Sequence, residues 1–281
     1  MTSMSTVWDR TTDFLSDRLS IVAAIALPAV FVPNAVQGIV QPLSPTAGPF
    51  GQLGLSILTV ALTLVGVWGQ TALIALALEP MLTRGAAFRQ ATSRFGAAIG
   101  VALLLLLALA ALTIPVWAIL VGYGVDLAAL ADGAKPDVPT AAGLWIALYT
   151  IVVLPVVIWL WARLLPVSAV VVAERRGAGA IRRAFALTDG LAGRIVGVAI
   201  LFLIVVLVAT LAAKTVFGSI LRLVFGDVGA INAASVVTAI VVALVSTIFS
   251  AIGCAFAAKL YLALRDREDA RIADTARSAP A

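Results

Sequence analysis

Residues 97–122 read AAIGVALLLLLALAALTIPVWAILVG, 26 residues without one charged side chain. Crossing the hydrocarbon core of a bilayer takes about 20 consecutive apolar residues, each rising about 1.5 Å, so this stretch is long enough. The whole chain of 281 residues is 62% hydrophobic and 12% charged, with a mean hydropathy of +1.12. Soluble domains are about 45–50% apolar and about 25% charged. We therefore predict an integral membrane protein.

Five further apolar stretches make the predicted fold all-α, a polytopic protein with six transmembrane helices. The predicted spans are about 20–40, 52–78, 97–122, 140–163, 193–217 and 231–264. The fourth can continue as helix to Ala173. Prolines inside the first, third and fourth spans predict kinks; they are Pro28, Pro33, Pro115 and Pro155.

Two charged segments flank the membrane domain of residues 20–264. Residues 1–19 carry an acidic stripe (Asp9, Asp13, Asp17) and an apolar one (Trp8, Thr11, Leu15, Leu19), so they are predicted to form a cytoplasmic, interfacial amphipathic segment. Pairing of the acidic stripe with arginine-rich segments elsewhere is a second interpretation. The start lacks the net positive charge of a cleaved signal peptide. Residues 265–281 are charged with alternating sign and are predicted to be a mobile cytoplasmic tail.

The arginines and lysines predict the orientation. With the amino terminus inside, 16 of the 19 basic residues fall in cytoplasmic segments, and only Lys135, Lys214 and Arg222 fall outside. Such an asymmetry follows the positive-inside rule. We expect both termini in the cytoplasm and, for a chain of this type, a location in the bacterial inner membrane.

Two cytoplasmic connections repeat one pattern. Residues 87–91 (AFRQA) correspond to residues 180–184 (AIRRA), and in each copy an acidic residue closes the preceding span while a GxxxG pair opens the next. The acidic residues are Glu79 and Glu174; the glycines are Gly96 and Gly100, then Gly193 and Gly197. Because both copies enter from the same side, they predict a parallel internal repeat with two cytoplasmic amphipathic elbows.

Each elbow has helical periodicity, with arginines off the apolar stripe, which suits a helix lying in the inner interface. The arginines are candidate contacts to anionic headgroups or partner proteins: Arg89, Arg94, Arg175, Arg176, Arg182 and Arg183. The paired glycines permit close helix packing. Intramolecular packing of the two equivalent spans is the favoured interpretation, and a homodimer face is the alternative.

Four polar or charged residues near span ends form a candidate intramembrane network: Gln70, Glu79, Arg163 and Glu174. Arg163 and Glu174 are 11 residues apart, about three helical turns, so they share a face but cannot pair directly. Each would need a partner such as Glu79 or Gln70. Anchoring at the interface is the favoured role, and a polar conduit or lipid-headgroup pocket is the alternative.

The stretch RLLPVSAVVVAERRGAGAIRRAFALTDG, residues 163–190, carries a family resemblance. With six spans around it, it resembles the membrane-domain family of glycerophosphoryl diester phosphodiesterases and related bacterial six-span inner-membrane proteins of unknown function. The matching residues are Arg163, Pro166, Glu174, Gly179, Ile181 and Arg182, with the elbow shifted by one residue from the family pattern. The catalytic phosphodiesterase domain of fused members is absent, so the resemblance implies a membrane module without that reaction.

The composition excludes several function classes. The chain has no histidine and one cysteine, Cys254, and it carries no P-loop or CxxC spacing. Asp126, Asp132 and Asp137 are too irregularly spaced to predict a metal site. We expect no catalytic residue, cofactor, metal or nucleic-acid partner. The predicted function is a non-enzymatic module that organises membrane lipids or partner proteins; a transporter or channel for a small or lipidic substrate is the alternative. A membrane enzyme would require Glu79 and Glu174 to cluster.

Overall fold

The computed structural model describes residues 4–126, 138–225 and 232–278, and every regular element in these ranges is helical. Six helices there are long and apolar enough to cross a membrane, so the all-α class and the six predicted spans are confirmed. They are Leu19–Ser44, Pro49–Leu78, Arg84–Gly122, Thr140–Glu174, Ala192–Leu221 and Ala233–Arg277. Asp132, Asp137 and the connection over 226–230 lie outside the described residues.

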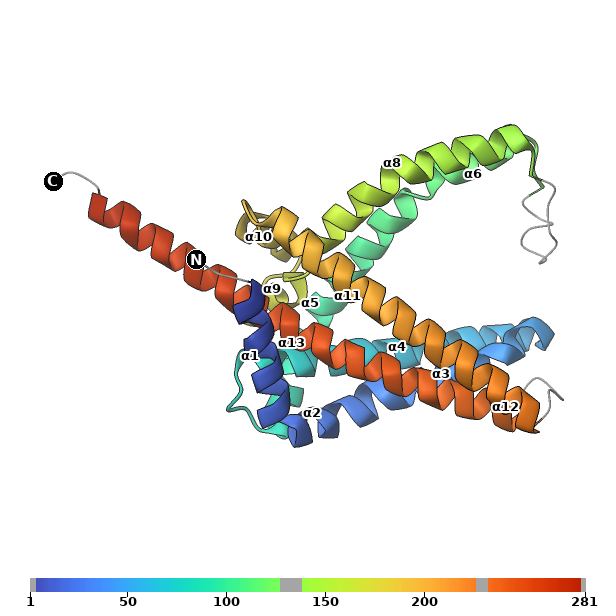
Figure 1. The fold of residues 1–281 in the computed structure, drawn as a ribbon, viewed down its shortest axis with the longest axis horizontal. Coiled ribbons are helices and arrows are strands. Elements are labelled where there is room, and N and C mark those ends of the chain that lie inside the picture. The colour runs from blue at the N-terminus through green and yellow to red at the C-terminus, as the bar shows by residue number, and fades with distance from the viewer. Residues whose placement is uncertain (1–3, 127–137, 226–231, 279–281) are drawn as a thin grey trace.

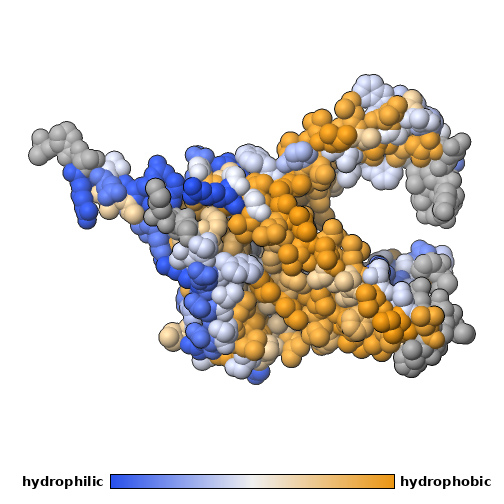
Figure 2. All heavy atoms as spheres, viewed as in Figure 1, coloured by the Kyte–Doolittle hydropathy of each residue, from blue (hydrophilic) through white to orange (hydrophobic). Residues whose placement is uncertain are grey.

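The helices are arranged as a V whose closed end carries most of the charge (Figures 1 and 2). The elements are α1 (Met4–Asp17), α2 (Leu19–Ala26), α3 (Val32–Val40), α4 (Pro49–Leu78), α5 (Arg84–Ala111), α6 (Ile114–Gly122), α8 (Thr140–Leu164), α9 (Val167–Glu174), α10 (Gly179–Leu187), α11 (Ala192–Ala212), α12 (Gly218–Phe225) and α13 (Ala233–Ser278). Helices α6 and α8 form one arm, and α3, α4, α12 and α13 form the other. Helix α11 leads from the closed end into the second arm.

The buried core lies at the closed end of the V. The short valine-rich helix α9 sits inside it, and the last turns of α4 (71–77) and the middle of α13 (254–264) are almost wholly buried around it. Along the arms, by contrast, large apolar side chains such as Leu107 and Ile151 are exposed. Continuous apolar surface of this extent is characteristic of contact with lipid.

The prolines predicted to kink the spans lie in different local structures. Pro28 lies in a π-helical turn, Leu27–Phe31, between α2 and α3, and Pro115 lies in the first turn of α6, just after α5 has ended. Helix α8 instead runs through Pro155 and ends at Leu164, before Pro166. A proline removes one backbone donor, so a helix can bend there without ending.

The two basic arms are built differently. The first is not a separate helix: α5 begins at Arg84, where the Thr83 hydroxyl caps the Ala86 amide at 3.3 Å, and continues without a break into the third span. The second arm is its own helix, α10. A turn containing Gly190, whose φ of +73° is one that L side chains rarely adopt, separates it from α11.

Both flanking segments are helical, but only the amino-terminal one packs closely on the core. Helix α1 buries Val7, Thr11 and Phe14 against the core and α13. Of the predicted apolar stripe, Thr11 is buried and Leu15 is partly buried against the core, whereas Trp8 and Leu19 are exposed. None of its aspartates pairs with a basic arm within the described residues. Helix α13 continues to Ser278, so the segment predicted to be a mobile tail is helical through 265–278.

Among the described glycines, Gly69 makes the closest contact with a neighbouring helix, and the glycines of the two GxxxG pairs make none. A Cβ added to Gly69 of α4 would lie 2.5 Å from the Ala29 Cβ and 2.8 Å from the Ala29 carbonyl oxygen. At Gly96, Gly100, Gly193 and Gly197 it would meet no atom within 4 Å. Within the described residues, the predicted intramolecular packing through those four glycines is therefore wrong, because no other helix approaches them.

Candidate functional site

A charged cluster ties α9, α10 and α13 together at the closed end. The Glu174 carboxylate accepts hydrogen bonds from Arg183 Nε at 3.1 Å and Tyr261 Oη at 3.2 Å, and it pairs with Arg176 Nε at 3.0 Å. The two remaining nitrogens of Arg183 bind both oxygens of Glu268, with Nη1–Oε1 at 2.7 Å. We call these five residues the Glu174 cluster. A guanidinium held in this bidentate way is a strong, directional partner for a carboxylate.

Arg183 is the centre of this cluster and has a structural role. The hydrogen bonds to Glu268, and then those to Glu174, raise the pKa of the Arg183 guanidinium above its ordinary value against the opposing effect of burial. Its side chain is 24% exposed, whereas neighbouring Arg182 points away and is exposed. Of the two adjacent arginines predicted to contact lipid, Arg182 is the accessible one.

Arg163 has a partner that the sequence analysis missed. Its Nη2 donates to Asp189 Oδ1 at 3.0 Å, and its guanidinium lies 5.0 Å from the Trp159 ring centroid and 5.4 Å from that of Phe185. These contacts hold the end of α8 against α10 and the turn that follows it. Cation–π contacts with two rings stabilise a partly buried arginine.

The predicted network of Gln70, Glu79, Arg163 and Glu174 is not assembled. Glu79 is exposed at the end of α4 and forms no ion pair with the described residues. Gln70 lies more than two helical turns before Glu79 and faces a cavity. Arg163 and Glu174 each belong to one of the ion pairs described above. The expectation that Glu79 or Gln70 would serve as their partner is wrong, because Arg163 pairs with Asp189 in the turn after α10, and Glu174 pairs with Arg176 and Arg183.

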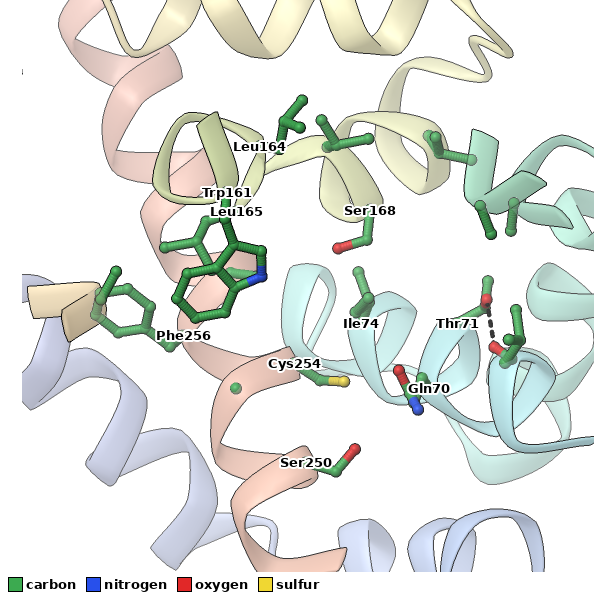
Figure 3. A pocket seen from close by; sticks show the side chains of 18 of the residues that line it. Gln70, Thr71, Ile74, Trp161, Leu164, Leu165, Ser168, Ser250, Cys254 and Phe256 are labelled. Carbon is green, nitrogen blue, oxygen red and sulfur yellow. Dashed lines mark hydrogen bonds between the residues drawn. The ribbon is translucent and has the colours of Figure 1, made fainter. Parts of the chain in front are cut away.

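A cavity of about 540 Å³ lies where the arms meet, and we call it the vertex cavity (Figure 3). Helices α1, α4, α5, α8, α9, α11 and α13 all contribute to its wall. Most lining side chains are apolar, including Trp161, Ile74 and Phe256; the polar ones include Gln70 and Ser168. The Gln70 amide forms no side-chain hydrogen bond with the described residues and is free to meet a ligand.

A larger and more polar cavity, of about 1140 Å³, lies toward the open end of the V between α3, α4, α12 and α13. Asn34, Gln37 and Lys214 line it, and Ser246 lines both this cavity and the vertex cavity. Three polar residues of the spans, Asn34, Gln37 and Gln70, therefore line two cavities that share Ser246 in their walls. Arg163 lines neither.

One further basic residue is important although no pattern in the sequence marks it. Lys259 of α13 is only 9% exposed; its Nζ donates to the Ala77 carbonyl at 2.9 Å and lies 4.9 Å from the Phe14 ring centroid. A cation at the carbonyl end of a helix is stabilised by the helix dipole. Lys259 thus joins α1, the end of α4 and α13.

Within the described residues, no group of three or more His, Cys, Asp or Glu side chains is placed to hold a metal ion. The fold and its apolar faces define the class, a multi-pass helical membrane protein. Comparison of the chain with protein-family models, curated proteins and solved structures found no match.

Proposed function

We propose that this protein is a non-enzymatic module of the bacterial cytoplasmic membrane that holds and organises lipid at its charged end. The vertex cavity carries the proposal. Its volume of about 540 Å³ is of the size that accommodates a ligand. Transfer of a hydrocarbon chain from water into a cavity with mainly apolar walls is favourable. The few polar groups of the wall can orient the ligand.

In this proposal the charged end faces the cytoplasm, together with both termini. The support is the placement of 16 of 19 basic residues in segments on one side of the six spans. The basic arms, within α5 and in α10, then act as the elbows of a parallel repeat. Exposed Arg89 and Arg182 would meet anionic headgroups or an acidic partner, each contributing about 1 kcal/mol near the surface.

The resemblance of residues 163–190 to the membrane-domain family of glycerophosphoryl diester phosphodiesterases belongs to the same proposal. It supports a membrane module that works without the phosphodiesterase reaction. The geometry around Pro166, where α8 gives way to α9, provides much of the cavity wall on this side, through Leu164, Val167 and Ser168. The family-like stretch and the proposed lipid site therefore overlap.

Filling the cavity tests the proposal. Ala98 of α5 lines the vertex cavity, whereas Ala108 on the same helix is exposed away from it. We expect the wild-type protein, released from mild detergent, to retain a lipid that native mass spectrometry detects. Ala98→Phe should abolish that retention because the new ring occupies the chain's space, and Ala108→Phe should leave it unchanged. Equal retention by all three proteins would contradict the proposal.

Movement of a lipidic substrate through the protein is the second candidate, favoured by the position of Ser246 in the walls of both cavities. Its test is transfer of a fluorescent lipid between the leaflets of liposomes that contain the protein. If the cavities form a conduit, Ser246→Trp should slow transfer several-fold while lipid retention persists. Transfer no faster than in protein-free liposomes would remove this candidate.

A further inference from the structure

Arg94 lies on α5, one helical turn before the first residue of that helix that lines the vertex cavity. On α5 it precedes Ala98 by four residues and Val101 by seven, so the three share one helix face, and the latter two line the cavity. Its Nε is buried and has no hydrogen-bond partner within the described residues. A buried donor without a partner is rare in folded proteins and calls for an explanation.

Arg175 lies three residues beyond Val172, the last residue of α9 that lines the vertex cavity. It is the residue after α9, and it adopts a left-handed conformation with φ of 56° and ψ of 29°, the only positive φ of a described non-glycine residue. Ser168, Val171 and Val172 of α9 line the vertex cavity, and α9 packs on α5. Because α5 and α9 pack on each other, the charges of Arg94 and Arg175 fall on neighbouring elements beside the same cavity. Strained backbone of this kind concentrates at ligand sites.

No carboxylate neutralises these two arginines. Glu174 directly precedes Arg175, but its oxygens are already engaged by Arg183, Arg176 and Tyr261. Within the described residues, neither Arg94 nor Arg175 forms an ion pair. Two arginines without an ion pair therefore lie on adjacent helices next to an apolar cavity, and the buried Nε of Arg94 has no described partner.

We propose that Arg94 and Arg175 bind the phosphate of a membrane lipid whose acyl chain occupies the vertex cavity. The inference rests on the proposed function and specifies its ligand. A phosphate oxygen relieves the repulsion between the two cations and accepts the buried Nε–H of Arg94. The planar fork of a guanidinium matches the geometry of phosphate oxygens. The apolar wall beginning one turn away at Ala98 then receives the chain of the same molecule.

The experiment compares two lipids with the same chains in binding to the full-length protein in detergent micelles. Phosphatidic acid carries the phosphate and diacylglycerol does not. We expect phosphatidic acid to bind at least about tenfold more tightly, since a charge-assisted pair is worth roughly that factor. Arg94→Gln should remove this preference. So should Arg175→Asn, in which asparagine tolerates the left-handed backbone and preserves the fold. Arg84→Gln, at the far start of α5, is the matched control and should preserve the preference.

The outcomes separate this inference from the function on which it rests. Equal affinity for the two lipids, unaffected by Arg94→Gln, would overturn the phosphate site. The proposal that the cavity binds acyl chains would still hold. Failure of both lipids to bind would overturn the function itself. Inorganic phosphate supplies the third arm: if it binds as tightly as phosphatidic acid, the site is for a soluble anion and the lipid assignment is wrong.

Discussion

Replacing Gly69 by leucine should lower the thermal stability of the protein in detergent by more than any other single change considered for this chain. The reason is the contact of α4 with the turn around Pro28: a Cβ at position 69 would lie 2.5 Å from the Ala29 Cβ and 2.8 Å from its carbonyl oxygen. Because part of that obstacle is backbone, a rotamer change cannot relieve it, and the helices must separate. Overpacking of this kind costs up to about 3 kcal/mol.

The matched control for Gly69→Leu is Gly66→Leu, about one turn earlier on α4. A Cβ at Gly66 would meet nothing within 4 Å. Both changes replace glycine by a better helix former, so their intrinsic effects on α4 are alike. The midpoint of thermal unfolding, followed by tryptophan fluorescence, should fall sharply for Gly69→Leu and stay near the wild-type value for Gly66→Leu. Similar midpoints for the two variants would mean that α4 does not approach Ala29 so closely.

Neutralising Arg183 should have the second largest effect. Arg183→Gln removes the bidentate contact with Glu268 and one of the donors to Glu174, whose carboxylate is only 17% exposed. Removing one partner of a largely buried ion pair leaves the other charge poorly compensated, and we expect a loss of about 2–3 kcal/mol. Helix α10 should loosen from α13 as a result, which proteolysis within 176–190 would report.

Arg182→Gln serves as the control for Arg183→Gln, since Arg182 is the adjacent residue on α10 and is exposed. A surface change of this kind stays within about 0.5 kcal/mol. Arg183→Lys keeps the charge but loses the planar fork, so its stability should lie between those of the wild type and Arg183→Gln. Equal stability of the two glutamine variants would show that the Glu174 cluster does not hold α10 in place.

The sequence is sufficient to predict the class and the six spans because their signal is local. Each span is a run of apolar residues long enough to cross a bilayer, and hydropathy registers this without any knowledge of neighbours. The helix ends are less well predicted. The first basic arm is continuous with the third span because nothing between Arg84 and Ala111 breaks the helix. The second arm is separated from the fifth span by a turn that contains Gly190.

The pairings at the candidate site could not be predicted in this way. Arg163 finds Asp189 26 residues away, and Arg183 finds Glu268 85 residues away. Both depend on how α10 folds back over α8 and α13, which periodicity within one helix does not encode. The prediction of helix packing through the GxxxG glycines was wrong for the same reason. GxxxG spacing reports a smooth face, but it is Gly69 whose face meets another helix.

The central claim is that an acyl chain occupies the vertex cavity between α5, α9 and α13 in the bilayer. An electron cryomicroscopy map of the protein in lipid nanodiscs tests it most directly. If a chain occupies the cavity, elongated density should run from near Arg94 past Ser168 and Gln70. A map in which the two arms pack together, with side chains filling this space and no such density, would contradict it.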